Sequence, residues 1–157
     1  MTVDPDNLKA SLPGRPRDVW AWACYDWASS AYSTLSITIL VYYIQAVVLP
    51  GDWGPVVWAW GISLSMFVAA VLSPVVGAMA DANRNKRRWL AATALGGAAA
   101  SLAIAAVPPT SPSLVVGFFV LTALMFELSL GFYNGFLPEI ADEHAMNRVS
   151  AWGYALG

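Results

Sequence analysis

Ionisable residues are scarce in this sequence. Asp, Glu, Lys and Arg make up 11% of it, whereas soluble domains carry about 25%. The net charge of −2 excludes the basic surface that a nucleic-acid partner would require. The single cysteine, Cys24, excludes an internal disulfide. The single histidine, His144, stands in a predicted loop, and the sequence has no metal-ligand cluster and no nucleophile–base pair. We therefore expect neither an enzyme nor a cofactor.

Apolar sequence is abundant instead. Hydrophobic residues make up 58% of the chain, and its mean hydropathy is +0.57. Four segments nearly free of charge each reach the roughly 17–25 residues that a helix needs to cross a bilayer. Helix is expected because each unpaired backbone polar group in hydrocarbon costs several kcal/mol. The sequence predicts an all-α polytopic bundle in a lipid bilayer, with spans at about 28–49, 56–80, 89–107 and 114–137.

The basic residues predict the orientation of the bundle. All eight lie in the N-terminal tail (1–17), in the second connection or after the fourth span. The positive-inside rule then places the N-terminus and the second connection in the cytoplasm, as in a protein of the bacterial inner membrane. Tryptophans are expected at both interfaces, and all eight lie near predicted span ends: Trp20, Trp22, Trp27, Trp53, Trp58, Trp60, Trp89 and Trp152.

A further apolar segment begins at about residue 149 with the letters VSAWGYALG. In this sequence it is too short to cross a membrane. We expect the natural chain to continue into a fifth helix or to be a truncated product. The transmembrane bundle of residues 18–157 is therefore expected to be incomplete.

Small residues recur along the second span at four-residue steps. Residues at this spacing lie on one stripe of a helix, and small side chains there let a neighbouring helix approach closely. The fourth span repeats the pattern. Ordinary bundle packing explains these stripes, whose members are Gly61, Ser65, Ala69 and Ser73, followed by Gly77 and Asp81, and in the fourth span Gly131 and Gly135.

Asp26 stands between two aromatic residues at the start of the first span. At 100° per residue, Ser29, Ser30 and Ser33 fall on the same side of the helix as Asp26. Two interpretations remain open. Asp26 is either an interfacial carboxylate that meets water, or the start of a hydrated groove that runs into the membrane. The row of hydroxyls favours the groove.

Glu127 lies near the middle of the fourth span, where an ionised carboxylate facing lipid would be costly. No basic residue lies in any span. Glu127 must therefore face a watery cavity, be protonated, or pair with a part of the protein outside this sequence. A static hydrogen bond of a protonated Glu127 is one interpretation, and proton coupling is favoured. Asn134 shares its face of the helix, and we expect the Asp26 and Glu127 stripes to face one funnel open to the cytoplasm.

The second connection, GAMADANRNKRRW, resembles the G-x-x-x-D-[RK]-x-G-[RK]-[RK] loop of the major facilitator superfamily of transporters. Gly77 and Asp81 match this motif, as do the cations that follow them. Two positions depart from it, because Ala82 replaces a basic residue and Arg84 replaces the turn glycine. We expect Asn83 to take the left-handed backbone conformation instead. The matching cations are Lys86, Arg87 and Arg88.

Three further segments narrow the resemblance. YDWASSAY (25–32) is similar to the YDWANSAY signature of the autophagy-related vacuolar effluxer family, whose bacterial members are called the unknown major facilitator family. Here Ser29 replaces the usual Asn. FYNGFLPEIA (132–141) and RVSAWGYALG (148–157) resemble the same family's fourth-to-fifth-helix region. The order and spacing of these motifs identify the chain as similar to this family.

The resemblance implies a twelve-helix fold of two six-helix halves, of which this chain would be the first third. It implies that the first and fourth helices line a central cavity and that transport proceeds by alternating access. Asp81 would latch the cytoplasmic side against the missing half, with Arg84 and its basic neighbours in support. Eukaryotic relatives are associated with amino-acid efflux from the vacuole.

These observations predict a fragment of a secondary transporter for a small solute, such as an amino acid or a metabolite. We expect it to be proton-coupled through Glu127 or Asp26. Its expected partners are lipid, the small-molecule substrate, protons, and either the remainder of the transporter or further copies of the chain. The alternative is a four-helix membrane scaffold or self-associating subunit that transports nothing.

Overall fold

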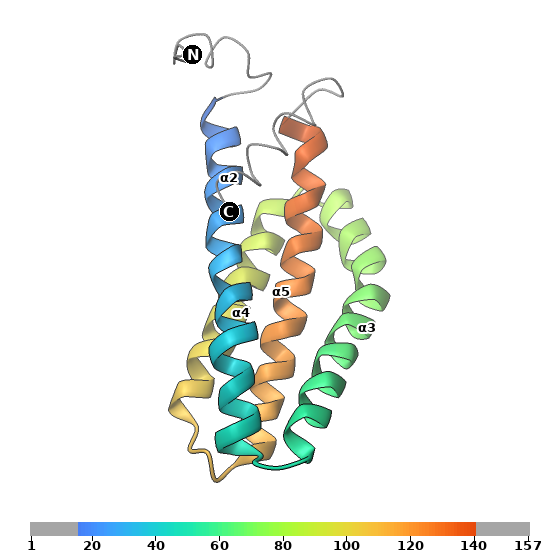
Figure 1. Ribbon diagram of the computed structural model, residues 1–157. Coiled ribbons are helices and arrows are strands. Elements are labelled where there is room, and N and C mark those ends of the chain that lie inside the picture. Colours follow the sequence, from blue (N-terminus) through green and yellow to red (C-terminus); the bar gives the residue numbers. More distant parts are fainter. Residues whose placement is uncertain (1–15, 141–157) are drawn as a thin grey trace, which may run out of the picture. The chain divides into compact units, whose positions relative to one another are not determined.

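The computed structural model describes residues 16–140, with side chains from Trp20 to Phe136. Three of the four long helical segments are α3 (Trp53–Ala82), α4 (Lys86–Ala106) and α5 (Pro112–Ile140). The first segment combines α2 (Pro16–Leu35) with the π-helical stretches η1 (Ser36–Leu40) and η2 (Tyr43–Val48) (Figure 1). Residues 1–15 of the N-terminal tail, His144, Arg148, Trp152 and the expected fifth helix lie outside the described residues.

The four predicted spans are confirmed as helices. Within residues 16–140, four helical segments are long and apolar enough to cross a membrane: residues 20–48, 53–82, 86–106 and 112–136. The first helix begins at Pro16, where a proline is well tolerated because the first helical N–H needs no partner. α3 and α4 are separated by only three residues, so these helices extend beyond the expected bounds of 80 and 89. The fold is all-α, as the sequence predicts.

The first helix changes its hydrogen-bond pattern in its second half. The Leu49 backbone N–H donates to the Ile44 carbonyl at 2.9 Å, five residues earlier. That is the π-helical spacing, which is rare and often occurs near functional sites. A rotation of 100° per residue therefore fails beyond Ser36, and the face presented by η1 and η2 cannot be read from α-helical periodicity.

The described chain divides into two compact units. Residues 16–35 and 133–140 belong to one, unit 1, and residues 36–132 form the other, unit 2. Unit 2 holds η1, η2, α3, α4 and most of α5, and unit 1 holds α2 and the end of α5.

Candidate functional site

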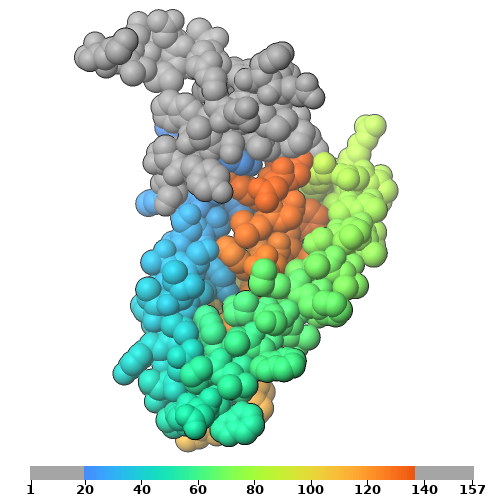
Figure 2. Space-filling model, turned by 45° about the vertical axis from the view of Figure 1, so that its right-hand side comes forward, coloured from blue at the N-terminus to red at the C-terminus, as the bar shows by residue number. Residues whose placement is uncertain are grey.

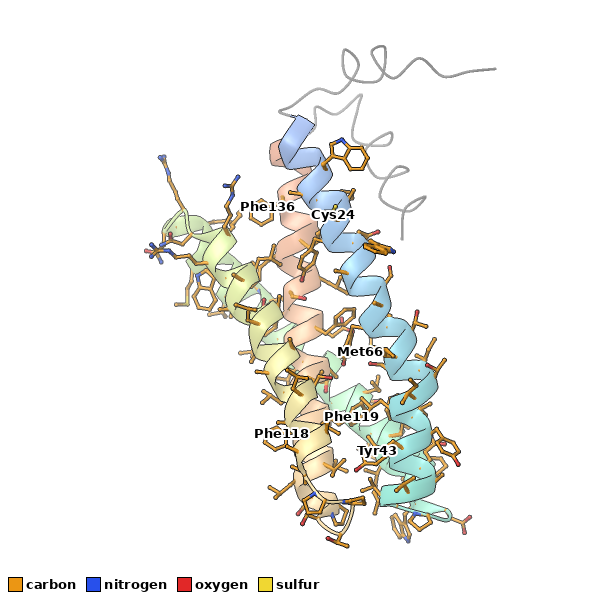
Figure 3. All side chains as sticks on the ribbon, turned by 90° about the vertical axis from the view of Figure 1, so that its left-hand side faces the viewer. Cys24, Tyr43, Met66, Phe118, Phe119 and Phe136 are labelled. Carbon is orange, nitrogen blue, oxygen red and sulfur yellow. The ribbon has the colours of Figure 1, made fainter. Side chains whose placement is uncertain are left out.

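An apolar core closes one end of unit 2. It lies at the end where the first connection (49–52) and the third connection (107–111) leave the helices; we call this the first-connection end. Phe119 is completely buried and stacks on Trp58 with ring centroids 4.4 Å apart; Figure 3 labels it beside Tyr43. The core draws on η2, α4 and α5 through the buried residues Ile44, Val48, Ile104, Val115 and Phe119.

α3 packs tightly on α5 next to this core. A Cβ atom added at Gly61 would lie 2.6 Å from Phe119 Cε1, closer than such atoms approach in real structures. One turn further, the buried Ser65 hydroxyl donates to the Gly61 carbonyl at 2.8 Å and the Val120 carbonyl at 3.0 Å. The second of these bonds joins the two helices directly. Small side chains on α3 are therefore required here by the close approach of α5.

The contact between α3 and α5 loosens toward the second connection. Among the described residues, a Cβ atom at Gly131 would meet only the Ser73 hydroxyl, at 4.0 Å, and one at Gly77 would meet nothing within 4 Å. Ser73 and Asp81 are exposed, whereas Ala69 is buried. We call this line of contact, from Gly61–Phe119 to Ser73–Gly131, the α3–α5 seam. Its contacts are closest at the Gly61–Phe119 end and reach ordinary van der Waals distance at Ser73–Gly131.

Glu127 lies on the α5 face that follows this seam. It comes seven residues after Val120 and four before Gly131, so all three lie on one side of the helix. Val120 contacts Ser65 and Gly131 faces Ser73, and Ala69 lies midway between those two serines. Helix geometry therefore places Glu127 on the α5 face that is directed toward α3. The Glu127 side chain is half-buried and has no hydrogen bond or ion pair within the described residues.

Asp26 is half-buried in unit 1. Its side chain makes no hydrogen bond or ion pair with any residue that the structure describes. The Ser29 hydroxyl donates to the Asp26 backbone carbonyl at 2.8 Å, and the Ser33 hydroxyl donates to the Ser29 carbonyl at 3.4 Å. Ser30 is half-buried. At least two hydroxyls of the expected stripe are thus turned onto their own helix, as is common for serine inside helices.

Aromatic rings join α2 to the end of α5 in unit 1. Tyr133 stacks on Trp22, with centroids 4.5 Å apart, and on Tyr25, with centroids 5.2 Å apart. The Trp22 indole N–H also donates to the Tyr133 carbonyl at 3.3 Å. Asn134, next to Tyr133, is exposed and Gly135 is half-buried. Trp22 is buried against Tyr133, and its place at the membrane interface stays a prediction.

The second connection contains an ion pair and a strained residue. Lys86 Nζ lies 2.8 Å from Asp81 Oδ1, so the predicted latch carboxylate is paired inside its own loop. Arg84 has φ = 50°, the left-handed region, whereas Asn83 has φ = −91°. The expectation for Asn83 is wrong, because Arg84 itself takes the backbone conformation of the glycine that it replaces. Arg87 and Arg88 are exposed.

The structure brings some predicted site residues together and leaves others apart. Glu127 faces the packing stripe of α3 in unit 2, and Asp26 and Asn134 both belong to unit 1. The common funnel for Asp26 and Glu127 stays a prediction. Among residues 16–140, no group of three or more His, Cys, Asp or Glu side chains is arranged to hold a metal ion.

Sequence reasoning missed two kinds of residue. The Trp22–Tyr133 stack has only a weak signal, namely aromatic residues at positions 22 and 25, one turn apart on the first helix. The Thr122 and Ser36 hydroxyls are buried and have no hydrogen-bond partner within the described part of the chain. Thr122 stands alone in an apolar run, which gives no sign of its burial, whereas Ser36 lies at the margin of the hydroxyl stripe expected on the first helix.

Comparisons of the sequence with a family profile and with individual proteins agree with one another. Residues 57–154 match the sequence profile of the family described as "Vacuole effluxer Atg22 like". A Bacillus subtilis (strain 168) protein described as the uncharacterized MFS-type transporter YxiO is 31% identical over 142 residues. That match covers 87% of this chain and 33% of the relative, so the chain spans about a third of the relative's length. No solved structure matches the chain.

Proposed function

Because the chain belongs to the vacuole effluxer Atg22-like family of major facilitator (MFS)-type transporters, we propose that it is the N-terminal part of a secondary transporter. The transporter moves a small organic solute, such as an amino acid or a metabolite, across a bacterial inner membrane by alternating access. Protons drive it through Glu127. Asp26 and Asn134 contribute to the solute pathway.

Glu127 carries this proposal. It is an ionisable residue in the middle of an apolar helix, which is costly unless it serves a purpose. Its side chain has no cationic partner within residues 16–140, and every basic residue of that range lies outside the cores of the spans. An intramembrane carboxyl group without a cationic partner is the kind of residue that proton relays in transporters use.

The test is transport by the native polypeptide in membrane vesicles. Labelled small solutes are screened with and without an imposed pH gradient, and the screen is repeated with Glu127→Gln. We expect the variant to lose about tenfold or more of the gradient-driven flux, since an amide cannot carry the proton. Asp52→Asn is the matched control, because Asp52 is an exposed carboxylate between η2 and α3 that caps no helix end through its side chain.

Glu127→Gln also separates a transporter from a membrane scaffold. An unchanged flux and an unchanged pH dependence would contradict the assignment of Glu127. A complete absence of transport for every solute, with normal membrane insertion, would favour the scaffold instead. An antibody against the N-terminal tail tells which polypeptide to assay, because its band in source-cell membranes either exceeds 16.8 kDa or matches it.

A further inference from the structure

The first helix turns a serine inward where η1 begins. Ser36 is the buried residue of η1, whereas Ile37 and Ile39 are exposed; Figure 2 shows the outer side of η1 and η2 as the cyan surface of unit 2. Isoleucine can face outward here because lipid is as apolar as a protein core. The Ser36 side chain is only 9% exposed, and its hydroxyl has no hydrogen-bond partner within the described residues. A buried hydroxyl without a partner costs free energy, so its partner needs to be identified.

Thr122 on α5 shows the same feature. Its side chain is 1% exposed, and its hydroxyl also has no hydrogen-bond partner within residues 16–140. Two other buried hydroxyls of unit 2 are satisfied by carbonyls of their own helices, that of Ser129 at 2.8 Å and that of Thr93 at 2.9 Å. The helix backbone therefore satisfies these hydroxyls, and it leaves those of Ser36 and Thr122 to another partner.

Ser36 and Thr122 both lie next to the apolar core of unit 2. Leu40, at the other end of η1, packs against that core, and Phe119 belongs to it. The first helix ends where α5 begins, at the first-connection end, so the two helices run antiparallel (Figure 1). Ser36 precedes Leu40 by about one turn, and Thr122 follows Phe119 by about one turn. Both hydroxyls therefore lie on the same side of the core and at a similar depth.

The buried side chains become smaller between the core and this layer. On α4, Ile104 belongs to the core, and Ala100, one turn earlier, is also buried. The three helices thus contribute leucine, isoleucine and phenylalanine to one layer, and serine, alanine and threonine to the next. The smaller side chains leave more space between the helices, and two hydroxyls border that space. An enclosed space with polar groups to satisfy is where proteins bind internal water.

We propose that Ser36 and Thr122 bind a shared internal water molecule that joins the first helix to α5. A water molecule can accept a hydrogen bond from one hydroxyl and donate one to the other. Ser36 is also the residue at which α2 gives way to the π-helical η1, and water that inserts beside a helix is a known cause of local breaks in its hydrogen-bond ladder. This water site does not depend on the proposed role of Glu127.

Removing each hydroxyl tests the site through the sign of the effect. Ser36→Ala and Thr122→Val are made singly and together in the native polypeptide, and unfolding is titrated with sodium dodecyl sulfate in mixed micelles. A hydroxyl that binds water stabilises the protein, whereas a dry, unpaired hydroxyl destabilises it. We expect each single variant to raise the unfolding equilibrium constant about threefold. The double variant should raise it by less than the product of these effects, because both hydroxyls bind one water molecule.

Ser129→Ala and Thr93→Val are the matched controls. They make the same chemical changes at buried positions whose hydroxyls bond only their own helices, so we expect little change in the unfolding constant. Thr122→Ser keeps the hydroxyl and should raise the constant less than Thr122→Val does. This second variant separates loss of the hydroxyl from loss of packing.

Solid-state NMR in lipid bilayers detects the water directly. Magnetisation transferred from water protons should reach the Thr122 side chain sooner than that of Thr93, which is similarly buried and bonded within its helix. In the Ser36→Ala variant, the transfer to Thr122 should slow, because the shared water molecule loses one of its partners.

Three results would overturn the site. If Ser36→Ala and Thr122→Val stabilise the protein relative to their controls, or if water transfer to Thr122 is no faster than to Thr93, the hydroxyls are dry. If the two substitutions destabilise additively and Ser36→Ala leaves the transfer to Thr122 unchanged, the hydroxyls share no water molecule. If sodium in place of potassium stabilises the protein at equal ionic strength, and the double variant abolishes this effect, the space binds a cation instead.

Discussion

The two halves of the stripe on α3 have the same residue spacing and different surroundings. Gly61, Ser65 and Ala69 are buried, whereas Ser73 and Asp81 are exposed, and a Cβ atom at the half-buried Gly77 would meet no described residue within 4 Å. Small residues every four positions therefore show that a helix face can accept a neighbour, and they do not show that it does. What distinguishes the halves is the opposing helix: a completely buried phenylalanine faces the first half, and a glycine faces the second.

The largest effect on the free energy of unfolding should come from truncating Phe119. Phe119→Ala deletes a buried ring that packs on Trp58 and Gly61. We expect the free energy of unfolding to fall by about 3 kcal/mol, the low end for such truncations, because lipid is as apolar as the core. Titration with sodium dodecyl sulfate in mixed micelles measures it. Met66→Ala, on the exposed side of α3, is the control, and an equal loss there would show that the two faces do not differ.

Glycine-to-alanine substitutions compare the two halves directly. Alanine favours a helix over glycine by about 1 kcal/mol at both positions. At Gly61 the new methyl group would press on the Phe119 ring, which costs about 1–3 kcal/mol, whereas at Gly77 it meets open space. Gly77→Ala should therefore stabilise the protein. The unfolding free energy of Gly61→Ala should be about 2 kcal/mol lower than that of Gly77→Ala in the same micelle titration. Equal unfolding free energies of the two variants would show that α3 is packed alike at Gly61 and Gly77.

Serine-to-alanine substitutions sharpen the same comparison at a smaller scale. Ser65→Ala removes the hydrogen bond to the Val120 carbonyl, and such interhelical bonds in membranes average about 0.6 kcal/mol. Ser73 is exposed, and no hydrogen bond from its hydroxyl is formed within the described residues. We expect Ser73→Ala to leave the unfolding free energy unchanged. If Ser73→Ala lowered the unfolding free energy more than Ser65→Ala, the close contact between α3 and α5 would not lie at Ser65.

The smallest effect on stability is expected in the second connection, the loop between α3 and α4. Arg84 occupies the left-handed region, which costs a residue with a side chain about 1–2 kcal/mol. Glycine avoids that cost and loses about 0.5–1 kcal/mol more backbone entropy on folding. Arg84→Gly should therefore stabilise the protein by a few tenths of a kcal/mol. Arg84→Ala keeps the backbone strain and should not stabilise the protein. If it did, the effect of Arg84→Gly would come from the loss of the charge and not from the backbone.

Composition and hydrophobic runs were enough to predict four membrane helices, since their length and lack of charge leave few alternatives. Helix periodicity also placed Glu127, Gly131 and Asn134 on one face, because α5 is a regular α-helix. The motif resemblance predicted the family that the match over residues 57–154 establishes. These successes share one cause: each depends on local sequence alone.

Contacts between helices could not be predicted in the same way. Trp22 and Trp58 stack on rings of α5, and the sequence did not predict either contact. Nothing near either residue in the sequence distinguishes it from Trp53 or Trp60, which are exposed. Likewise, Asn83 has the better intrinsic preference for a left-handed turn, and the three-residue connection between α3 and α4 imposes that conformation on Arg84 instead.

The π-helical turns of η1 and η2 have a consequence for comparing relatives. A π turn closes its hydrogen bonds over five residues, so it holds one residue more than the α-helical turn that it replaces. Deleting a single residue between Tyr43 and Val48 would let that turn revert to α-helix while Ile44 kept its place in the core. Homologous chains are thus expected to differ here by one-residue gaps within an uninterrupted helix, and an alignment that forbids gaps inside helices would misplace every position on one side of them.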